Sequence, residues 1–174
     1  MIGVPAKMSV LVGEQFACLK ISGRANFSSS VDFKTLINEL LCKGYRYFVL
    51  DLSECALMDS TFLGVLAGFG LKLGAAGATG NSSAIEVLNA NARIVELLEN
   101  LGVLHLFKLS EGACEATADA EPVALTPCTP TKEEVTRACL EAHRTLMELN
   151  PENVARFKDV AAFLAEDLKR LKPA

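Results

Sequence analysis

The sequence predicts an α/β domain with a mixed sheet and crossover helices, followed by a C-terminal α-helical hairpin. Over residues 1–109, short apolar runs typical of strands alternate with segments in which apolar residues recur at helical spacing. Because strands separated by single helices need crossover connections, the sheet is expected to be largely parallel or mixed. Residues 131–174 carry two further helical patterns divided by Asn150-Pro151, and these predict the hairpin.

The first half of the domain is expected to contain two strands, a helix and a third strand. The strand pair covers residues 8–12 and 15–21. A polar loop over 24–30 then leads to a helix, with Ser30 as its N-cap and Gly44 at its end. The apolar positions of this helix recur at helical spacing: Phe33, Leu36, Ile37, Leu40 and Leu41. A continuous aromatic and branched run, typical of a strand buried on both faces, follows it: Tyr47-Phe48-Val49-Leu50.

The second half of the domain is expected to contain a helix, a strand, another helix and a last strand. A connection over 51–59 leads into a helix that begins near Ser60. Its inward stripe is expected to consist of apolar side chains: Phe62, Leu63, Leu66, Phe69 and Leu73. A strand over 84–88 precedes a helix that Gly102 ends, and residues 104–109 form the last strand.

The C-terminal third of the chain has a different character. Residues 110–130 mix alanine and acidic residues with prolines, which is typical of a linker. Thr131 and Glu134 then match a capping box. Apolar residues follow at alternating steps of four and three: Val135, Cys139, Ala142, Leu146 and Leu149, then Val154, Phe157, Ala161, Leu164, Leu168 and Leu171. Such narrow seams must bury against each other, against the first domain or against another subunit.

The composition is that of a folded domain with no general affinity for anionic partners. The chain has 174 residues, of which 51% are apolar, and a mean hydropathy of +0.30. Its net charge of −4 gives no overall attraction to nucleic acid or to an anionic membrane. The start of the chain lacks a signal-peptide pattern, and the apolar run over 62–71 is shorter than the roughly 20 residues that cross a bilayer. We therefore expect a cytoplasmic protein without membrane insertion.

The segment with the clearest chemical content runs from Phe48 to Leu66. A buried strand and a short connection bring Asp59 and Ser60 to the start of a helix, where unpaired N–H groups face solvent. Phosphorylation of Ser60 would add about −1.5 to −2 charges, which the positive helix end tolerates and a docked partner would have to desolvate. Such a site can change binding without unfolding the domain. The same residues also fit a simpler interpretation, in which Asp59 or Ser60 is only the N-cap.

The start of this helix resembles a known motif. In the STAS family, which includes bacterial anti-sigma factor antagonists and the cytoplasmic tails of sulphate transporters, a strand is followed by Asp-Ser-Ser/Thr-Gly-Leu-Gly. This chain has Asp59-Ser60-Thr61-Phe62-Leu63-Gly64. The resemblance covers residues 8–109 and includes two flanking segments: Val49-Leu50-Asp51-Leu52 and Leu97-Leu98-Glu99-Asn100-Leu101-Gly102. It implies a STAS domain over 1–109, joined through the linker to the hairpin.

The resemblance also implies roles for individual residues. Ser60 would be the phosphoacceptor for a partner anti-sigma factor with serine kinase activity, and Thr61 would be a weaker alternative. The implied partner-binding residues lie at the helix start and in the loop after the second strand: Asn26, Asp59, Ser60, Thr61, Phe62 and Leu63. Phe62 stands where the family usually has glycine, and it either faces the core or lies beside the acceptor. The final helix of the family is expected to be shortened to the 110–120 stretch.

Taken with the resemblance, the sequence predicts a regulator of transcription in bacterial stress signalling rather than an enzyme. It would be an anti-sigma factor antagonist that binds an anti-sigma factor while Ser60 is unphosphorylated. The alternative is a constitutive scaffold or accessory STAS subunit of a signalling or transporter complex, assembled through the C-terminal helices. In that case a homodimer through these helices is expected.

Other kinds of site find little support in the residue patterns. The glycines between 64 and 80 invite a nucleotide-binding interpretation, but no G-x-G-x-x-G or P-loop lysine pattern follows a strand. The six cysteines include no C-x-x-C pair, so no metal or cofactor is expected, and most are interpreted as buried and reduced. Cys55 is interpreted as structural rather than as a redox sensor. His105 and His143 are expected to be surface or partly buried side chains, since neither has companions at a productive spacing.

Overall fold

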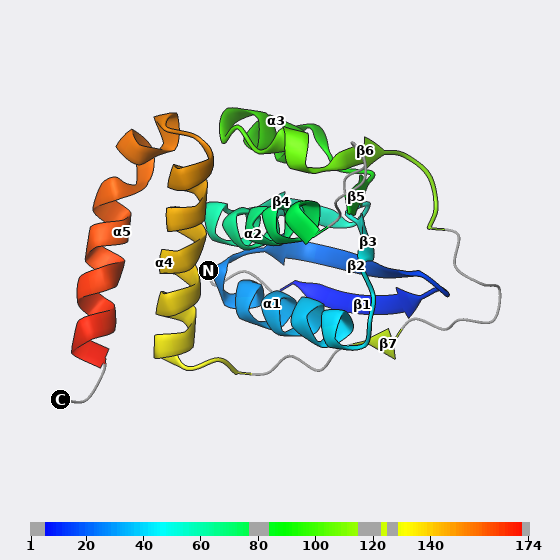
Figure 1. Cartoon of the computed structure of the whole chain (residues 1–174), viewed down its shortest axis with the longest axis horizontal. Helices are drawn as coiled ribbons and strands as arrows, with labels where there is room; N and C mark the ends of the chain where they lie inside the picture. Colours follow the sequence, from blue (N-terminus) through cyan, green and yellow to red (C-terminus); the bar gives the residue numbers. More distant parts are fainter. Residues whose placement is uncertain (1–5, 77–83, 115–122, 125–128, 172–174) are drawn as a thin grey trace.

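The computed structural model describes residues 6–76, 84–114, 123–124 and 129–171. Its strands are β1 (Lys7–Val12), β2 (Phe16–Ala25), β3 (Tyr47–Asp51), β4 (Cys55–Met58), β5 (Ile85–Leu88), β6 (Lys108–Ser110) and β7 (Val123–Ala124). Its helices are α1 (Phe27–Cys42), α2 (Ser60–Ala76), α3 (Ala92–Asn100), α4 (Lys132–Leu149) and α5 (Glu152–Leu171), with a 3-10 turn, η1 (Leu104–Leu106). The predicted α/β domain with a C-terminal helical pair is confirmed (Figure 1).

The described strands form a mixed sheet in the order β6-β5-β3-β2-β1-β7, and β4 pairs with the end of β2. β1 and β2 are antiparallel, whereas β2, β3, β5 and β6 are parallel because crossover segments that contain α1, α2 and α3 connect them. Ala25 of β2 is paired with Met58 of β4. The residues that follow them, Asn26 and Asp59, therefore leave the sheet side by side, at the edge where α1 and α2 begin.

The main core lies between one face of the sheet and helices α1, α2 and α3. Its largest fully buried side chains come from all of these elements: Leu19, Ile21, Phe33, Phe48, Leu50, Phe62, Leu63, Leu66, Ile94 and Leu98. The inward stripe predicted for the helix at Ser60 is confirmed, because its five side chains are at most 7% exposed. A smaller cluster on the other face contains Cys18, Val49 and Leu88.

The predicted polar loop before Ser30, and Ser30 as the N-cap, are wrong. β2 continues to the residue before Asn26, which is the actual N-cap and accepts a hydrogen bond from the Ser29 N–H at 3.3 Å. Ser30 is fully buried inside α1, and its hydroxyl donates to the Phe27 carbonyl at 2.6 Å. The helix starts early because Asp59, which is distant in sequence, accepts from the Phe27 N–H.

Two other element boundaries differ from the prediction. The expected connection over 51–59 contains β4, whose four residues are too few to carry a clear alternating pattern. The expected last strand over 104–109 begins with η1, in which the Leu106 N–H donates to the Val103 carbonyl at 3.0 Å. Only the end of this segment pairs as β6. Gly102, with φ of +72°, ends the preceding helix as predicted.

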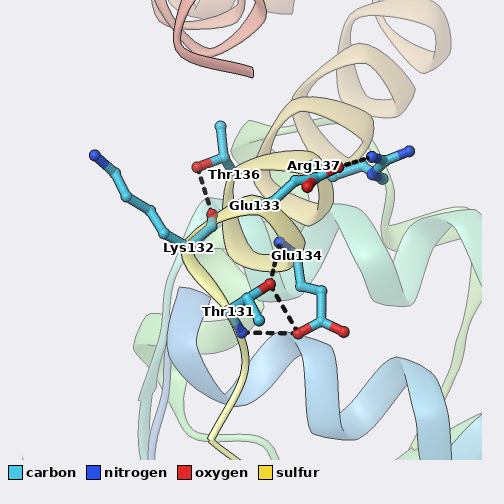
Figure 2. Close-up of polar contacts among 6 residues, drawn as sticks. All are labelled: Thr131, Lys132, Glu133, Glu134, Thr136 and Arg137. Carbon is cyan, nitrogen blue, oxygen red and sulfur yellow. Dashed lines mark hydrogen bonds and ion pairs between the residues drawn. The ribbon is translucent and has the colours of Figure 1, made fainter. Parts of the chain in front are cut away.

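The predicted capping box at the start of α4 is confirmed. Thr131 Oγ1 accepts from the Glu134 N–H at 3.2 Å, and Glu134 Oε2 accepts from the Thr131 N–H at 2.7 Å (Figure 2). In the first turns of the helix, Arg137 forms an ion pair with Glu133 on the outer surface (Figure 2). These contacts define where α4 begins.

The helical pair is docked on the first domain mainly through α4. This helix packs against α2 and, less extensively, against α1, while α5 packs against the other side of α4 (Figure 1). α5 also touches the first domain near its N-terminal end, where Asn153 Nδ2 donates to the Leu101 carbonyl at 2.9 Å and Arg156 donates to the Asn100 carbonyl at 2.8 Å. The predicted seam of α4 therefore buries against α5 and against the first domain. In the predicted seam of α5, Ala161 is buried and the later apolar residues are partly buried, whereas Val154 is 43% exposed and departs from the prediction.

The predicted linker over 110–130 is described only in part. Val123–Ala124 lie within it as β7, which pairs antiparallel with Ser9 and Val10 of β1. Most of the expected short helix over 110–120, and Cys128, lie outside the described residues. The division of the chain into residues 1–109, 110–130 and 131–174 stays a prediction.

Candidate functional site

Asp59 fixes the geometry of the site. Its Oδ1 accepts from the Phe62 N–H at 2.8 Å, which makes Asp59, rather than Ser60, the cap of α2. Its Oδ2 accepts from the Phe27 N–H at 2.7 Å, so one carboxylate holds the first turns of both α1 and α2. Burial raises the pKa of the Asp59 carboxyl above its usual value, while the N–H bonds from Phe62 and Phe27 act in the opposite direction. Of the two residues considered as the N-cap, Asp59 has that role. The Ser60 hydroxyl does not cap the helix and makes a different contact.

Replacement of Asp59 by alanine is expected to lower the free energy of unfolding by about 2 kcal/mol. The α2 helix loses its cap and the Phe27 N–H of α1 loses its acceptor, and each loss is worth roughly 1 kcal/mol. Urea denaturation followed by circular dichroism measures the change. Glu39→Ala, at an exposed position of α1, is the control and should change stability by less than about 0.5 kcal/mol. Equal losses in the two variants would contradict the double capping role.

Ser60 is the first residue of α2, and its hydroxyl contacts the C-terminal hairpin. Ser60 Oγ lies 3.1 Å from His143 Nε2, and His143 Nδ1 lies 2.6 Å from the Cys139 carbonyl. Because a carbonyl can only accept, Nδ1 carries the proton, and in the neutral ring Nε2 accepts from the Ser60 hydroxyl. His143 is only 6% exposed, so this contact lies under α4 rather than in open solvent.

The neighbours of Ser60 along α2 are covered by the same helix. Thr61 is 5% exposed, and its hydroxyl lies 3.6 Å from Cys139 Sγ, to which it donates. At the rim, Lys34 of α1 forms an ion pair with Glu141 of α4 at 2.7 Å. α4 therefore lies across the start of α2. It buries Thr61, the predicted alternative acceptor, and leaves Ser60, the predicted phosphoacceptor, half-buried beside His143.

The other predicted site residues fall into two groups. Asn26 lies at the same edge as Asp59 and caps α1, where its Oδ1 also accepts from the Ser28 hydroxyl at 2.7 Å. Phe62 and Leu63 are 0% exposed, so neither side chain is available to a partner in this conformation. Phe62 packs on Phe33 with 4.7 Å between ring centroids. Of the two orientations expected for Phe62, toward the core or beside the Ser60 acceptor, the structure therefore has the first. The partner-binding set and the phosphoacceptor stay predictions.

Sequence reasoning missed two side chains at this site. His143 was expected to be a surface or partly buried side chain, but it is only 6% exposed and contacts Ser60. Its spacing carried a signal, since it lies four residues after Cys139 and three before Leu146, on the seam of α4. Phe27, the first residue of α1, is 49% exposed beside Asn26 and offers an apolar contact at the edge where α1 and α2 begin.

A hydroxyl paired with an imidazole can form a nucleophile, so we considered whether Ser60 and His143 form a catalytic pair. A hydrolytic nucleophile needs N–H donors for the developing oxyanion. The Phe62 N–H, in the first turn of α2, already donates to Asp59 Oδ1. Within the described ranges there is also no group of three side chains suited to holding a metal ion. What the structure shows for Ser60 and His143 is a hydrogen-bonded contact between α2 and α4.

The described cysteines and His105 lie away from Ser60, apart from Cys139. Burial raises the pKa of the Cys55 thiol, which keeps it protonated and fits the structural interpretation. Cys18 and Cys139 are also buried, Cys114 is partly buried and Cys42 is exposed, so most of the described cysteines are buried, as expected. His105 is exposed, which agrees with the expectation of a surface or partly buried side chain. Gly77 and Gly80 lie outside the described residues.

The chain belongs to the STAS domain family, whose model matches residues 7–116. No curated protein matches the chain. Among solved structures, the fold is similar to a protein of Thermotoga maritima assigned as an anti-sigma factor antagonist, TM1081, with 20% identity, a TM-score of 0.51, and coverage of 60% of this chain and 85% of that one. An NMR structure of TM1081 gives 20% identity, a TM-score of 0.50 and coverage of 59% and 78%. The unphosphorylated anti-sigma factor antagonist SpoIIAA gives 13% identity, a TM-score of 0.49 and coverage of 61% and 89%.

Two further findings concern the C-terminal helices and the membrane. The family match ends before α4, so the helical pair lies outside the part of the chain that defines the family. None of the helices in the described ranges combines the length and the apolar character needed to cross a bilayer.

Proposed function

We propose that the protein is a phosphorylation-switched binding regulator of the anti-sigma factor antagonist type. In this proposal it is cytoplasmic, has no catalytic activity, and binds an anti-sigma factor with serine kinase activity while Ser60 is unmodified. The observation that carries the proposal is the position of Ser60 as the first residue of α2, next to the half-buried carboxylate of Asp59, which accepts from N–H groups at the starts of two helices. Family membership and the anti-sigma factor antagonists among the structural neighbours support it.

A phosphate at Ser60 would change binding through charge. It would bring about −1.5 to −2 charges to the helix start, beside the carboxylate of Asp59. The first-turn Phe62 N–H donates to that carboxylate, so it is not free to neutralise the phosphate. A partner that docks here would have to desolvate two adjacent anions, which is costly, whereas the capped helix itself stays formed. This asymmetry is what a binding switch requires.

The test uses the full-length protein with ATP, Mg²⁺ and each anti-sigma factor kinase encoded in the same genome. Intact-mass spectrometry with site mapping is expected to find one added phosphate at Ser60, lost in Ser60→Ala and kept in Thr61→Ala. Titration of the same kinase should give an affinity for Ser60→Asp that is lower than for the unmodified protein by roughly tenfold or more, about 1.4 kcal/mol. If no kinase modifies Ser60 and Ser60→Asp binds as well as the wild type, the switch is excluded.

That negative outcome would favour the alternative, a constitutive scaffold or accessory STAS subunit assembled through the C-terminal helices. One observation favours it: α5 exposes Phe163 by 69% and Val160 by 42% on the side away from α4. Such a face suits self-association to a homodimer. Sedimentation analysis of the same samples distinguishes a stable dimer from a monomer that binds only its regulator.

A further inference from the structure

The helical pair occupies the place where a regulator would reach Ser60. The family match ends at residue 116, whereas the helix that covers Ser60 begins at Lys132. His143 Nε2 accepts a hydrogen bond from the Ser60 hydroxyl at 3.1 Å. One turn earlier on α4, Cys139 Sγ accepts one from the Thr61 hydroxyl. A segment outside the family core therefore makes polar contacts with both the predicted phosphoacceptor and its alternative.

The contact is close because both helices present small residues to each other. A Cβ atom added to Gly64 of α2 would lie 2.5 Å from the carbonyl oxygen of Ala142 and 2.7 Å from its Cβ. Only glycine permits this approach, since Cβ atoms do not come that near to backbone atoms. Ala138 and Ala142 are themselves at most 5% exposed. α4 is thus fitted to α2 rather than resting loosely on it.

The contact also has a charge component. Lys34 of α1 and Lys72 of α2 line the same groove as Gly64, and α4 contributes Ala142 and Glu141 to it. Lys34 is paired with Glu141 at 2.7 Å. The face therefore combines a narrow strip of small residues with lysines at its rim. Its complement is a helix with small side chains next to an acidic residue.

α5 holds α4 in this position. The Phe157 ring of α5 packs edge-on against the His143 ring, with 4.9 Å between centroids. Asn153 is fully buried and donates to the carbonyls of Leu101 and Leu146, which joins the end of α3 to the end of α4. Two sets of contacts therefore hold the hairpin in place. One is the ring contact next to Ser60, and the other is the pair of Asn153 hydrogen bonds near the turn between α4 and α5.

We propose that α4 and the regulator compete for one surface, the α1–α2 face beside Ser60, and that α4 masks Ser60 in the structure described here. This inference rests on the proposed function. A kinase must bring its phosphoryl donor in line with Ser60 Oγ, and a docked α4 occupies that approach with His143. The partner that takes the place of α4 presents a helix with small side chains and an acidic residue for Lys34.

Two full-length variants test the masking from opposite sides of the contact. Gly64→Ala adds a methyl group that clashes with α4, and Ala142→Leu enlarges the opposing residue while leaving the first domain unchanged. The matched control is Gly68→Ala, one turn further along α2, where the added Cβ would meet only Thr145 Cγ2 at 3.9 Å. Hydrogen exchange reports opening of α4, and protection of β2 and β3 in the same experiment reports that the first domain is folded.

In both opening variants, amide exchange in α4 is expected to accelerate. The rate of Ser60 phosphorylation by the cognate anti-sigma factor kinase, and the affinity for it, should each rise roughly tenfold or more, because the binding-competent fraction increases. Gly68→Ala should match the wild type in all three measurements. Faster exchange in α4 with unchanged phosphorylation and affinity would overturn the masking and leave the proposed function standing. Unchanged exchange in both variants would overturn the close docking on which the masking rests. Opened variants that are neither phosphorylated nor bound would overturn the proposed function instead.

Discussion

Phe62→Ala is expected to lower the free energy of unfolding by about 4 kcal/mol, the middle of the range for removing a buried phenyl ring. The Phe62 ring is 0% exposed and packs between α2 and α1, with Phe33 at 4.7 Å. Phe33 also contacts Phe69 with 6.2 Å between ring centroids, so the cavity would open beside the two remaining rings of a cluster of three. Phe62→Gly, which restores the residue usual in the family motif, should cost about 1 kcal/mol more through helix propensity.

Phe163→Ala is the matched control for this prediction. It removes the same ring from a helix at a position that is 69% exposed, and it should change the unfolding free energy by less than about 0.5 kcal/mol. Urea denaturation monitored by far-UV circular dichroism compares the two variants. A loss below about 2 kcal/mol for Phe62→Ala would mean that the Phe62 ring does not fill the core as described.

Asn153→Asp is expected to destabilise the docked hairpin by about 3 kcal/mol at neutral pH. Asn153 is fully buried, and its Nδ2 donates to the carbonyls of Leu101 and Leu146 at 2.9 and 2.8 Å. Aspartate has almost the same shape but cannot donate when ionised, and its charge would face the Leu101 carbonyl oxygen. The loss should therefore become smaller as acidification protonates the new carboxyl group.

The measurement for Asn153→Asp is hydrogen exchange resolved by segment, because the hairpin can open without unfolding the sheet. Exchange should accelerate in α4 and α5 while β2 and β3 keep their protection. Gln15→Glu, at an exposed position between β1 and β2 and away from the groove that α4 lines, controls for the change of charge. Wild-type exchange in α5 of Asn153→Asp would show that these two hydrogen bonds do not hold the hairpin.

The elements that sequence predicts well are those whose signal is local and long. The stripe from Phe62 to Leu73 has the period of a helix over several turns, and the capping box at Thr131 joins residues only three apart. β4 and the start of α1 depend on contacts between distant residues. Asn26, Ser28, Ser29 and Ser30 are all N-cap types, and the choice among them is made where Asp59 meets the Phe27 N–H.

The candidate site divides along the same line. Its motif residues, Asp59 and Ser60, are consecutive and mark the start of α2 in the sequence itself. His143 lies 83 residues from Ser60, and only the docking of α4 brings the two side chains together. The apolar period of α4 predicts which face of the helix is buried, but it does not predict which surface packs against that face. The sequence alone also does not show that a side chain at position 64 would clash with Ala142, because that contact is made by a helix distant in sequence.

The contact between Phe157 and His143 gives α5 an influence on binding at a surface that it does not itself cover. If α4 masks Ser60, the apparent dissociation constant of a partner is the intrinsic constant divided by the fraction of molecules in which α4 is undocked. With about one molecule in a hundred undocked, the apparent affinity falls about a hundredfold. Each change of about 1.4 kcal/mol in the free energy of docking α4, including a change transmitted from α5 through Phe157, then shifts that constant about tenfold, although no residue touched by the partner has changed. The hairpin would thus set the concentration threshold at which the regulator responds, independently of the surface that recognises the partner.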